Sequence, residues 1–312
     1  MNISEYFGVK YPIFQGGMAW VAEAGLAAAV SNGGGIGFIA AGSANADWLR
    51  GQIKSARELT DKKFGVNVMM MSPETADVMQ LICDEKIPII TTGAGNPGKY
   101  MDELKKAGTK VVPVVSNVAL AIRLVRSGAS ALIAEGQEGG GHIGELTTMA
   151  LVPQIVDAVD IPVIAAGGIA DGRGVAAAFM LGASGVQLGT RFLSATECRI
   201  SREYKDKILK AKDSDTVVTG RNTGHPVRVL KNKLTKEALN MEKEDVSLEE
   251  YEEFLSGTLR KAVVDGDVDY GSMMSGQIAS MVKKEQPAAE IITEIFAEAK
   301  EVLKARGESF LW

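Results

Sequence analysis

The chain has few cysteines, few histidines and no long apolar run. Of its 312 residues only two are cysteine, Cys83 and Cys198, and they fit neither a metal-ligand spacing nor a disulfide framework. No stretch is apolar over the length of a membrane span, and residues 1–5 show no signal-peptide pattern, so we expect a cytoplasmic protein with no membrane partner. The net charge of −5 gives no support for nucleic-acid binding.

Glycine is abundant, with 35 residues, and the glycines form clusters between short apolar runs. Eight such runs alternate with amphipathic segments of helical length. The expected strands span residues 11–17, 36–42, 64–69, 88–93, 110–116, 131–136, 162–168 and 185–190. The expected helices span 21–32, 46–59, 73–84, 98–107, 118–127, 147–159 and 172–181. Eight regular βα units predict an α/β fold, a (β/α)8 TIM barrel over residues 1–198, in preference to an open doubly wound sheet.

The alternation stops after the eighth expected strand, and the charge becomes polarised. Residues 199–236 carry eleven Lys and Arg against four acidic residues, or +7, while 237–269 carry three against eleven, or −8. We expect a smaller, mostly helical subdomain at 199–270, inserted after strand 8 and lying over the barrel mouth. Residues 271–312 should return to the barrel, with a C-terminal helix packing on it. The basic stretch either docks an acidic partner or pairs with the acidic stretch beside it.

Glycine clusters end the last two expected strands, where TIM barrels commonly bind phosphate. Gly167 and Gly168 follow strand seven, and Gly189 and Thr190 follow strand eight. Backbone N–H groups at these positions predict an anion site, the alternative being tight turns that bind nothing. The G-x-G-x-x-A pattern at 35–40 is not a dinucleotide fingerprint, because it lies within a strand instead of opening a helix.

Several polar residues end the other strands, at the rim where barrel enzymes place their chemistry. Asn67 and Glu135 are candidates for contacts to a heterocycle and a hydroxyl, or else are satisfied strand-end groups. Gln15 and Gln187 are expected to point inward, and Met18 to lie against a flat ring. His142 stands among Gly140, Gly141 and Gly144, where it can exchange a proton near neutral pH, or is an incidental surface residue. His225 either reaches a substrate phosphate or belongs to a surface loop. No His, Cys, Asp and Glu spacing predicts a metal site.

The motifs taken together resemble a known family. Residues 15–19, Asn67, 135–136 with 139–144, 166–169 and 187–191 occur in the order found in the nitronate monooxygenase-like FMN barrels. The segments 91–97, 142–149 and 262–269 are similar more closely to the flavin-dependent enoyl-acyl-carrier-protein reductases of type II. The resemblance covers essentially the whole chain, and the ordered set is specific although each motif alone is weak.

This resemblance implies FMN in the barrel mouth, with its phosphate at Gly167, Gly168, Gly189 and Thr190 and its ring near Gly17, Met18 and Asn67. Further cofactor contacts are implied for Gly16, Thr92, Glu135, Gly140, Gly141 and Gln187, and substrate contacts for Ala94, Asn96 and His225. NADH or NADPH would be the electron donor, and an enoyl thioester on acyl carrier protein the substrate. A homodimer and a monovalent cation are further family expectations.

The implied reaction is hydride transfer from reduced flavin to the β carbon of the enoyl group in fatty acid elongation. His142 would hydrogen-bond the thioester oxygen or supply the proton for the α carbon. The alternative is a nitronate monooxygenase, with oxygen as electron acceptor and His142 as base. A flavin-free barrel, either a phosphosugar isomerase or a ligand-binding protein, is a third reading.

Overall fold

Eight parallel strands form a barrel, as the sequence predicts. The computed structural model describes residues 3–244 and 246–309. Its strands run in the order β1-β9-β8-β6-β5-β4-β3-β2, and a parallel bridge between Phe14 and Ile36 brings the two ends of this sheet together. Their bounds are β1 Ile13–Gln15, β2 Phe38–Gly42, β3 Gly65–Met69, β4 Ile89–Gly93, β5 Lys110–Val115, β6 Leu132–Glu135, β8 Val163–Ala166 and β9 Gly185–Leu188. The TIM-barrel prediction is therefore confirmed.

Helices surround the barrel, and their ends follow local capping chemistry. They are α2 Ala24–Asn32, α3 Ala46–Leu59, α4 Thr75–Asp84, α5 Met101–Ala107, α6 Val118–Arg126, α7 Thr148–Ala158 and α8 Gly172–Met180. The Asn45 side chain accepts the N–H of Trp48 at 2.9 Å, and Asn117 caps α6 in the same way. Gly108 ends α5 with a φ of 80°, in the left-handed region that glycine favours.

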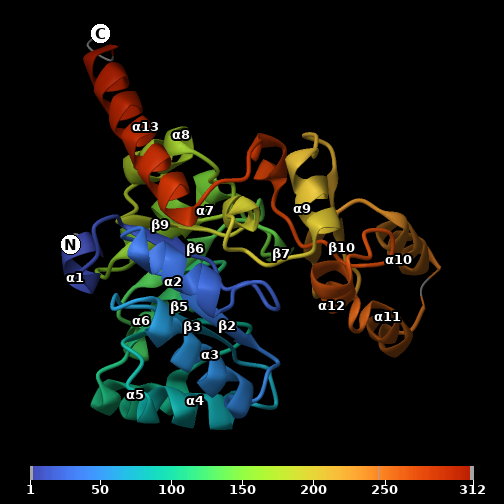
Figure 1. The fold of residues 1–312 in the computed structure, drawn as a ribbon, viewed down its shortest axis with the longest axis horizontal. Helices are drawn as coiled ribbons and strands as arrows, with labels where there is room; N and C mark the ends of the chain where they lie inside the picture. The colour runs from blue at the N-terminus through green and yellow to red at the C-terminus, as the bar shows by residue number, and fades with distance from the viewer. Residues whose placement is uncertain (1–2, 245, 310–312) are drawn as a thin grey trace.

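The short helix α1 (Ile3–Phe7) closes one end of the barrel (Figure 1). Its buried Ile3 and Phe7 belong to the same apolar cluster as Phe14, Phe38 and Ile133 from the strands. The rings of Phe7 and Phe14 meet edge to face, with centroids 5.3 Å apart. The opposite end, where the strands have their carboxyl ends, faces the subdomain (Figure 1).

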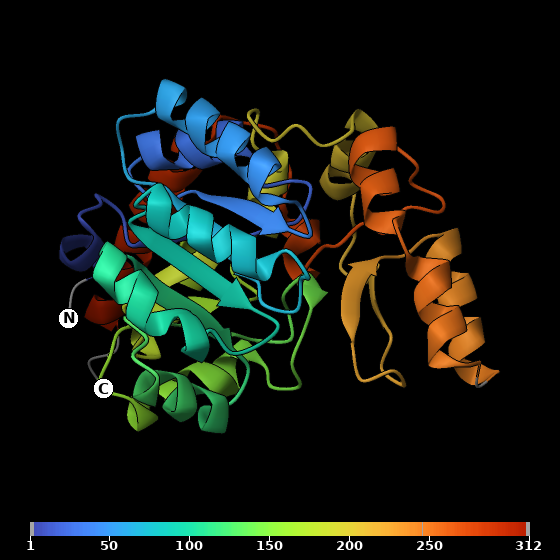
Figure 2. The ribbon, with the colours of Figure 1, turned by 90° about the horizontal axis from the view of Figure 1, so that it is seen from below.

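The subdomain contains a hairpin that the sequence analysis did not anticipate (Figures 1 and 2). Its helices are α9 Arg202–Leu209, α10 Lys233–Lys243, α11 Leu248–Leu255 and α12 Thr258–Arg260, the last followed by a π-helical turn, Lys261–Asp265. Its strands β10 Thr216–Thr219 and β11 Val227–Leu230 are antiparallel. A third strand, β7 Gly141–His142, comes from the barrel and pairs with β11. The loop that carries His142 is thus part of the subdomain sheet.

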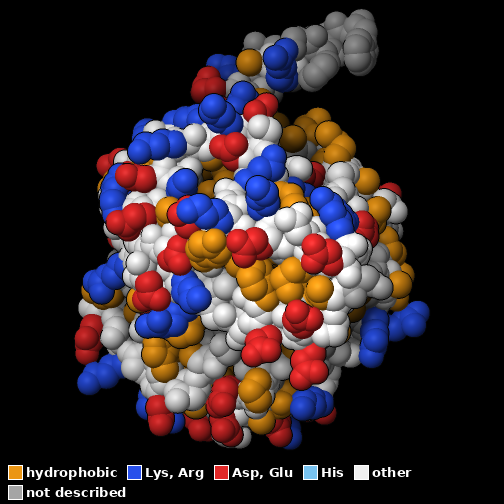
Figure 3. Space-filling model, turned by 90° about the vertical axis from the view of Figure 1, so that its right-hand side faces the viewer, with side chains coloured by type: hydrophobic (Ala, Val, Ile, Leu, Met, Phe, Trp, Pro, Cys, Tyr) orange, Lys and Arg blue, Asp and Glu red, His pale blue; other side chains and the backbone are white. Residues whose placement is uncertain are grey.

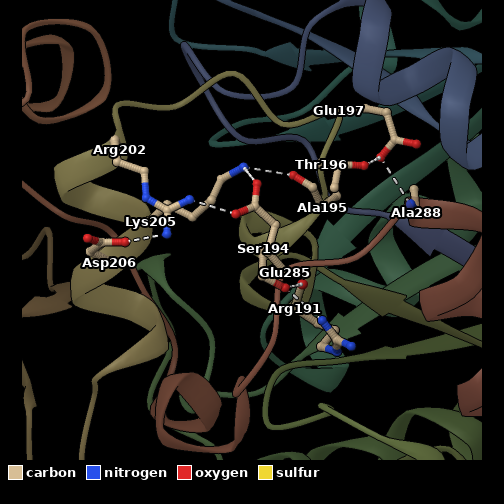
Figure 4. Close-up of polar contacts among 10 residues, drawn as sticks. All are labelled: Arg191, Ser194, Ala195, Thr196, Glu197, Arg202, Lys205, Asp206, Glu285 and Ala288. Atoms are coloured by element: carbon tan, nitrogen blue, oxygen red, sulfur yellow. Dashed lines mark hydrogen bonds and ion pairs between the residues drawn. The ribbon is translucent and has the colours of Figure 1, made fainter.

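The two chain segments that join barrel and subdomain are tied together by a polar cluster (Figure 4). The outgoing segment follows the 3-10 helix Thr190–Ser194, and the incoming segment follows the 3-10 helix Gln277–Met281. Lys205 is 6% exposed in its side chain, and its Nζ lies 2.7 Å from Glu285 and 3.0 Å from the carbonyl of Ala195. Arg202 also pairs with Glu285, at 2.7 Å. This cluster fixes the subdomain against the barrel.

The C-terminal helix α13 (Ala288–Ser309) returns to the barrel and packs beside α8 and α2 (Figure 1). Glu298 accepts the N–H of Gly172 at 2.7 Å, and the rings of Phe296 and Tyr11 stack with centroids 4.9 Å apart. Within residues 3–244 and 246–309, no helix combines the length and the apolar character needed to cross a membrane.

Candidate active site

A narrow glycine-lined cavity lies at the ends of β6, β8 and β9. Its walls include the four residues expected to hold a phosphate, namely Gly167, Gly168, Gly189 and Thr190. Gly167 and Gly168 have φ of 86° and 71°, and a Cβ on Gly167 would lie 2.6 Å from the carbonyl oxygen of Gly136. Only glycine fits there, so the backbone is open to a ligand as a phosphate cradle requires.

The C-terminal segment completes this cradle, a contribution that the sequence analysis missed. The N–H of Gly276 donates to Oγ1 of Thr190 at 2.9 Å, and the N–H of Gln277 donates to the carbonyl of Glu138 at 2.9 Å. A Cβ on Gly140 would lie 2.7 Å from the nitrogen of Gly276, so the two backbones are in direct contact. The Gly/Met composition of 271–277 was the available signal, since close backbone approach is what glycine permits.

The residues expected around a flat ring lie on neighbouring strand ends. Asn67 donates from Nδ2 to Oγ1 of Thr91 at 2.9 Å, and a Cβ on Gly17 would overlap the Asn67 side chain. Gly16 lies beside Gln187, and Gly189 beside the Met18 sulfur. Gln15 is buried and already bonded, accepting from the N–H of Phe38 at 3.0 Å. It therefore supports the strand and is not free for a ligand.

Thr92, for which a cofactor contact was implied, faces away from the barrel mouth. Thr92 is 1% exposed, and its Oγ1 makes no hydrogen bond within the described residues. It alternates along β4 with Thr91, whose hydroxyl meets Asn67, and it is in register with Val68, which belongs to the apolar cluster packed against α3 and α4. The structure therefore does not bring the Thr92 hydroxyl to the ring site, and the glycine cradle alone carries the fit to a phosphate-bearing group.

Glu135 ends β6 and faces the narrow cavity. Burial raises the pKa of its carboxyl to about 7. Near neutral pH the group is therefore poised between its acid and its anion, and it can donate or accept a hydrogen bond. The neighbouring Glu138 has a different task, because its carboxylate accepts the N–H and the hydroxyl of Thr148 at 3.0 Å each.

A second and larger cavity, of about 890 Å³, separates the barrel mouth from the subdomain. Of the three expected substrate residues, Ala94 and His225 line it. Asn96 does not line the cavity. Its Oδ1 accepts the N–H of Gly98 at 2.9 Å, and this bond shapes the turn before α5. Sequence reasoning did not foresee that Trp20, Tyr251 and Arg260 also line this cavity.

His142 also lines this large cavity, and strand β7 holds it in place. It is in register with Val227 of β11, and the N–H of Ile143 donates to the carbonyl of Pro226 at 3.1 Å. Desolvation, and then the charge of His225, lower the pKa of the His142 imidazole below its usual 6.5. At neutral pH His142 is thus uncharged, with one ring N–H to donate and one ring nitrogen to accept.

Comparison with known proteins gives consistent matches. The chain fits the model of a family described as nitronate monooxygenase over residues 2–298. The solved structure of FabK from Thermotoga maritima is 50% identical, covers 98% of each chain and has a TM-score of 0.95. A probable nitronate monooxygenase of Staphylococcus aureus is 33% identical over 97% of this chain and 98% of that protein. An octahydro-indene-carboxyl-CoA dehydrogenase of Mycobacterium tuberculosis is 39% identical over 74% of this chain and 66% of that protein.

Proposed function

Because the chain belongs to the nitronate monooxygenase family, we propose that it is the enoyl-acyl-carrier-protein reductase among that family's FMN-dependent oxidoreductases. The likeness to FabK, a type II enoyl reductase, confirms the resemblance predicted from the motifs. The observation that carries the proposal is the pairing of a phosphate-sized glycine cradle with a large, mainly apolar cavity lined by both His142 and His225. In this proposal the cradle would hold the cofactor and the large cavity would hold the acyl chain.

The residues present fit FMN. The cradle of Gly167, Gly168, Gly189 and Thr190 would hold the phosphate, and the Asn67 amide at the end of β3 would hydrogen-bond the ring system. When bound, FMN supplies hydride transfer between a nicotinamide donor and the enoyl double bond. The protein then has to bind the thioester, exclude water and stabilise the charge that develops on the thioester oxygen.

His142 is the residue proposed for that last task. Its neutral imidazole donates a hydrogen bond to the thioester oxygen as negative charge builds there. Of the two roles that the sequence left open, the lowered pKa favours hydrogen-bond donation over proton supply at neutral pH. Solvent then supplies the α-carbon proton, after the oxygen has been stabilised.

Acyl carrier protein is proposed as the substrate's carrier, with part of the basic stretch as its docking surface. Figure 3 shows Lys and Arg interspersed with Asp and Glu on the subdomain side of the molecule. Arg202 and Lys233 are among the cations already paired, with Glu285 and Asp269 at 2.7 and 2.8 Å. Docking would therefore use the unpaired members of the stretch. NADH or NADPH as donor, a monovalent cation, a homodimer and a cytoplasmic location stay predictions.

Anaerobic stopped-flow measurement of the two half-reactions tests the proposal. NADH or NADPH should bleach the flavin absorbance near 450 nm, and a crotonyl thioester of acyl carrier protein should restore it. The second candidate is a nitronate monooxygenase, favoured by the Staphylococcus aureus relative. It requires the opposite result, with no reoxidation by the thioester and oxygen uptake with an alkyl nitronate. A colourless protein that binds no FMN would contradict both.

A further inference from the structure

The large cavity has a guanidinium at its edge that no step of the proposed reaction uses. Arg260 ends α12 and immediately precedes the π-helical turn Lys261–Asp265. Left-handed glycines flank this unit, with φ of 72° at Gly257 and 73° at Gly266. The hydroxyl of Ser201, the residue that caps α9, donates to the carbonyl of Ala262 at 2.8 Å, so α9 anchors this turn. Isolated π turns frequently occur at functional sites, and this one orients Arg260.

Arg260 reaches from the subdomain to the barrel. Its guanidinium carbon lies 5.9 Å from the centroid of the Trp20 ring, which stands on the loop between β1 and α2. Trp20 has a φ of 65°, an uncommon conformation for a bulky residue, and it is 45% exposed. The same loop carries Gly17 and Met18, so the Trp20–Arg260 contact spans from the expected cofactor loop to the subdomain.

The guanidinium keeps most of its donors free. Its ion-pair partner among the described residues is Asp265, at 3.4 Å, and the two side chains are 51% and 48% exposed. Exposed pairs of this kind contribute little, and an arginine has five N–H donors. A stronger anionic ligand can therefore take the guanidinium without displacing a buried partner.

The rest of the cavity explains what such a ligand must look like. Among the described residues that line the cavity, Arg260 is the single permanently cationic side chain, and Glu252 is the single carboxylate. Apolar side chains make up much of the remaining wall, among them Met69, Ile143, Val229, Leu259 and Met274. An amphiphilic ligand would place its apolar part against this wall and a single anionic group at Arg260.

We propose that Arg260, braced by Trp20, binds a phosphate ester of a ligand that enters this cavity. The inference rests on the proposed function, in which two ligands carry such a group. One is the phosphopantetheine arm that bears the enoyl thioester, and the other is the nicotinamide nucleotide. A planar guanidinium matches phosphate oxygens in a bidentate way, whereas a lysine would act as a point charge.

Calorimetric titration of the oxidised holoenzyme tests the inference without turnover. The probes are phosphopantetheine, pantetheine, which lacks the phosphate, and the oxidised nicotinamide nucleotide. Arg260→Gln should weaken binding of a phosphate-bearing probe by about 10- to 100-fold, the range for a hydrogen bond to a charged group. Pantetheine affinity should stay within about 2-fold. Arg260→Lys should keep part of the affinity.

The probe that loses affinity identifies the source of the phosphate. Selective loss for phosphopantetheine assigns Arg260 to the carrier arm, and selective loss for the nucleotide assigns it to the electron donor. Lys233→Gln is the matched control, because it removes an ion-paired cation from the same subdomain outside the cavity lining. Equal affinities in wild type and Arg260→Gln for every probe would overturn the inference, as would parallel loss for pantetheine.

The outcome is separable from that of the proposed function. Binding of the phosphate-bearing probes can be normal in a protein that fails to reduce an enoyl thioester, which would refute the reaction but leave the phosphate site intact. A wild-type enzyme that reduces the thioester while Arg260→Gln binds every probe unchanged would refute the phosphate site alone.

Discussion

Glu285→Gln should lower the free energy of unfolding by about 2–3 kcal/mol at pH 7. The change leaves the buried Lys205 ammonium without its carboxylate partner, now 2.7 Å away. Removing one partner of a buried pair costs about 3–5 kcal/mol. The lower value applies here because Glu285 is 28% exposed and Lys205 keeps its bond to the carbonyl of Ala195.

The assay is thermal unfolding of the holoenzyme at several pH values. The unfolding entropy of a 312-residue chain makes each kcal/mol worth about 1.5 °C, so the melting temperature should fall by about 3–5 °C. The hydrogen bond from Lys205 holds the pKa of Glu285 below its usual 4.5. The stabilisation is therefore present above pH 4.5 and is lost as the pH falls through the lowered native value. Wild type and variant should converge in acid.

A matched control separates the buried pair from ordinary surface charge. Glu294 pairs with Lys284 at 2.8 Å, but the two side chains are 50% and 58% exposed. Glu294→Gln should change the unfolding free energy by less than about 0.5 kcal/mol. Adding Lys205→Met to Glu285→Gln should recover part of the loss, since it removes the stranded charge. Equal effects of Glu285→Gln and Glu294→Gln would refute the reasoning.

Two further predictions concern the mouth of the barrel. His142→Ala should slow flavin reoxidation by an enoyl thioester by about 10²-fold and leave flavin reduction near wild type in single-turnover traces; equal loss in both would indicate a structural role. The pKa of Glu135 is raised to about 7, so its carboxyl binds a proton more tightly in the native state than in the unfolded chain. The contribution of Glu135 to wild-type stability should therefore fall as the pH rises from 4.5 to 7. Glu135→Gln should remove at most about 3 kcal/mol of that fall, seen as a flatter melting temperature against pH.

The barrel could be predicted because its signals are local. Helix α3 has the predicted bounds, 46–59, since the Asn45 cap and the apolar spacing act within a few residues. The helix expected from Pro73 begins instead at Thr75, because the Ser72 hydroxyl accepts the N–H of Glu74 and the chain makes one more turn first. Rules on strand ends then placed the glycine cradle without any structural information.

The parts that were missed depend on contacts between distant segments. The hairpin β10–β11 consists of four-residue strands in a highly charged region, and its third strand comes from the barrel. Gly276, Trp20 and Arg260 enter the site from three separate parts of the chain. Asn96 appeared to be available for substrate, but short-range backbone capping uses its side chain. Composition and motif spacing do not predict which distant segments come into contact.

The strand β7 makes the subdomain inseparable from its host. With residues 199–270 excised, β11 would lose its partner on one side and present open backbone groups to water or to another copy, a known route to aggregation. An engineer who wished to transplant this subdomain onto another barrel would have to carry the Gly136–Gly144 loop with it. Any exchange of substrate range between relatives by recombination must therefore move two stretches of gene together.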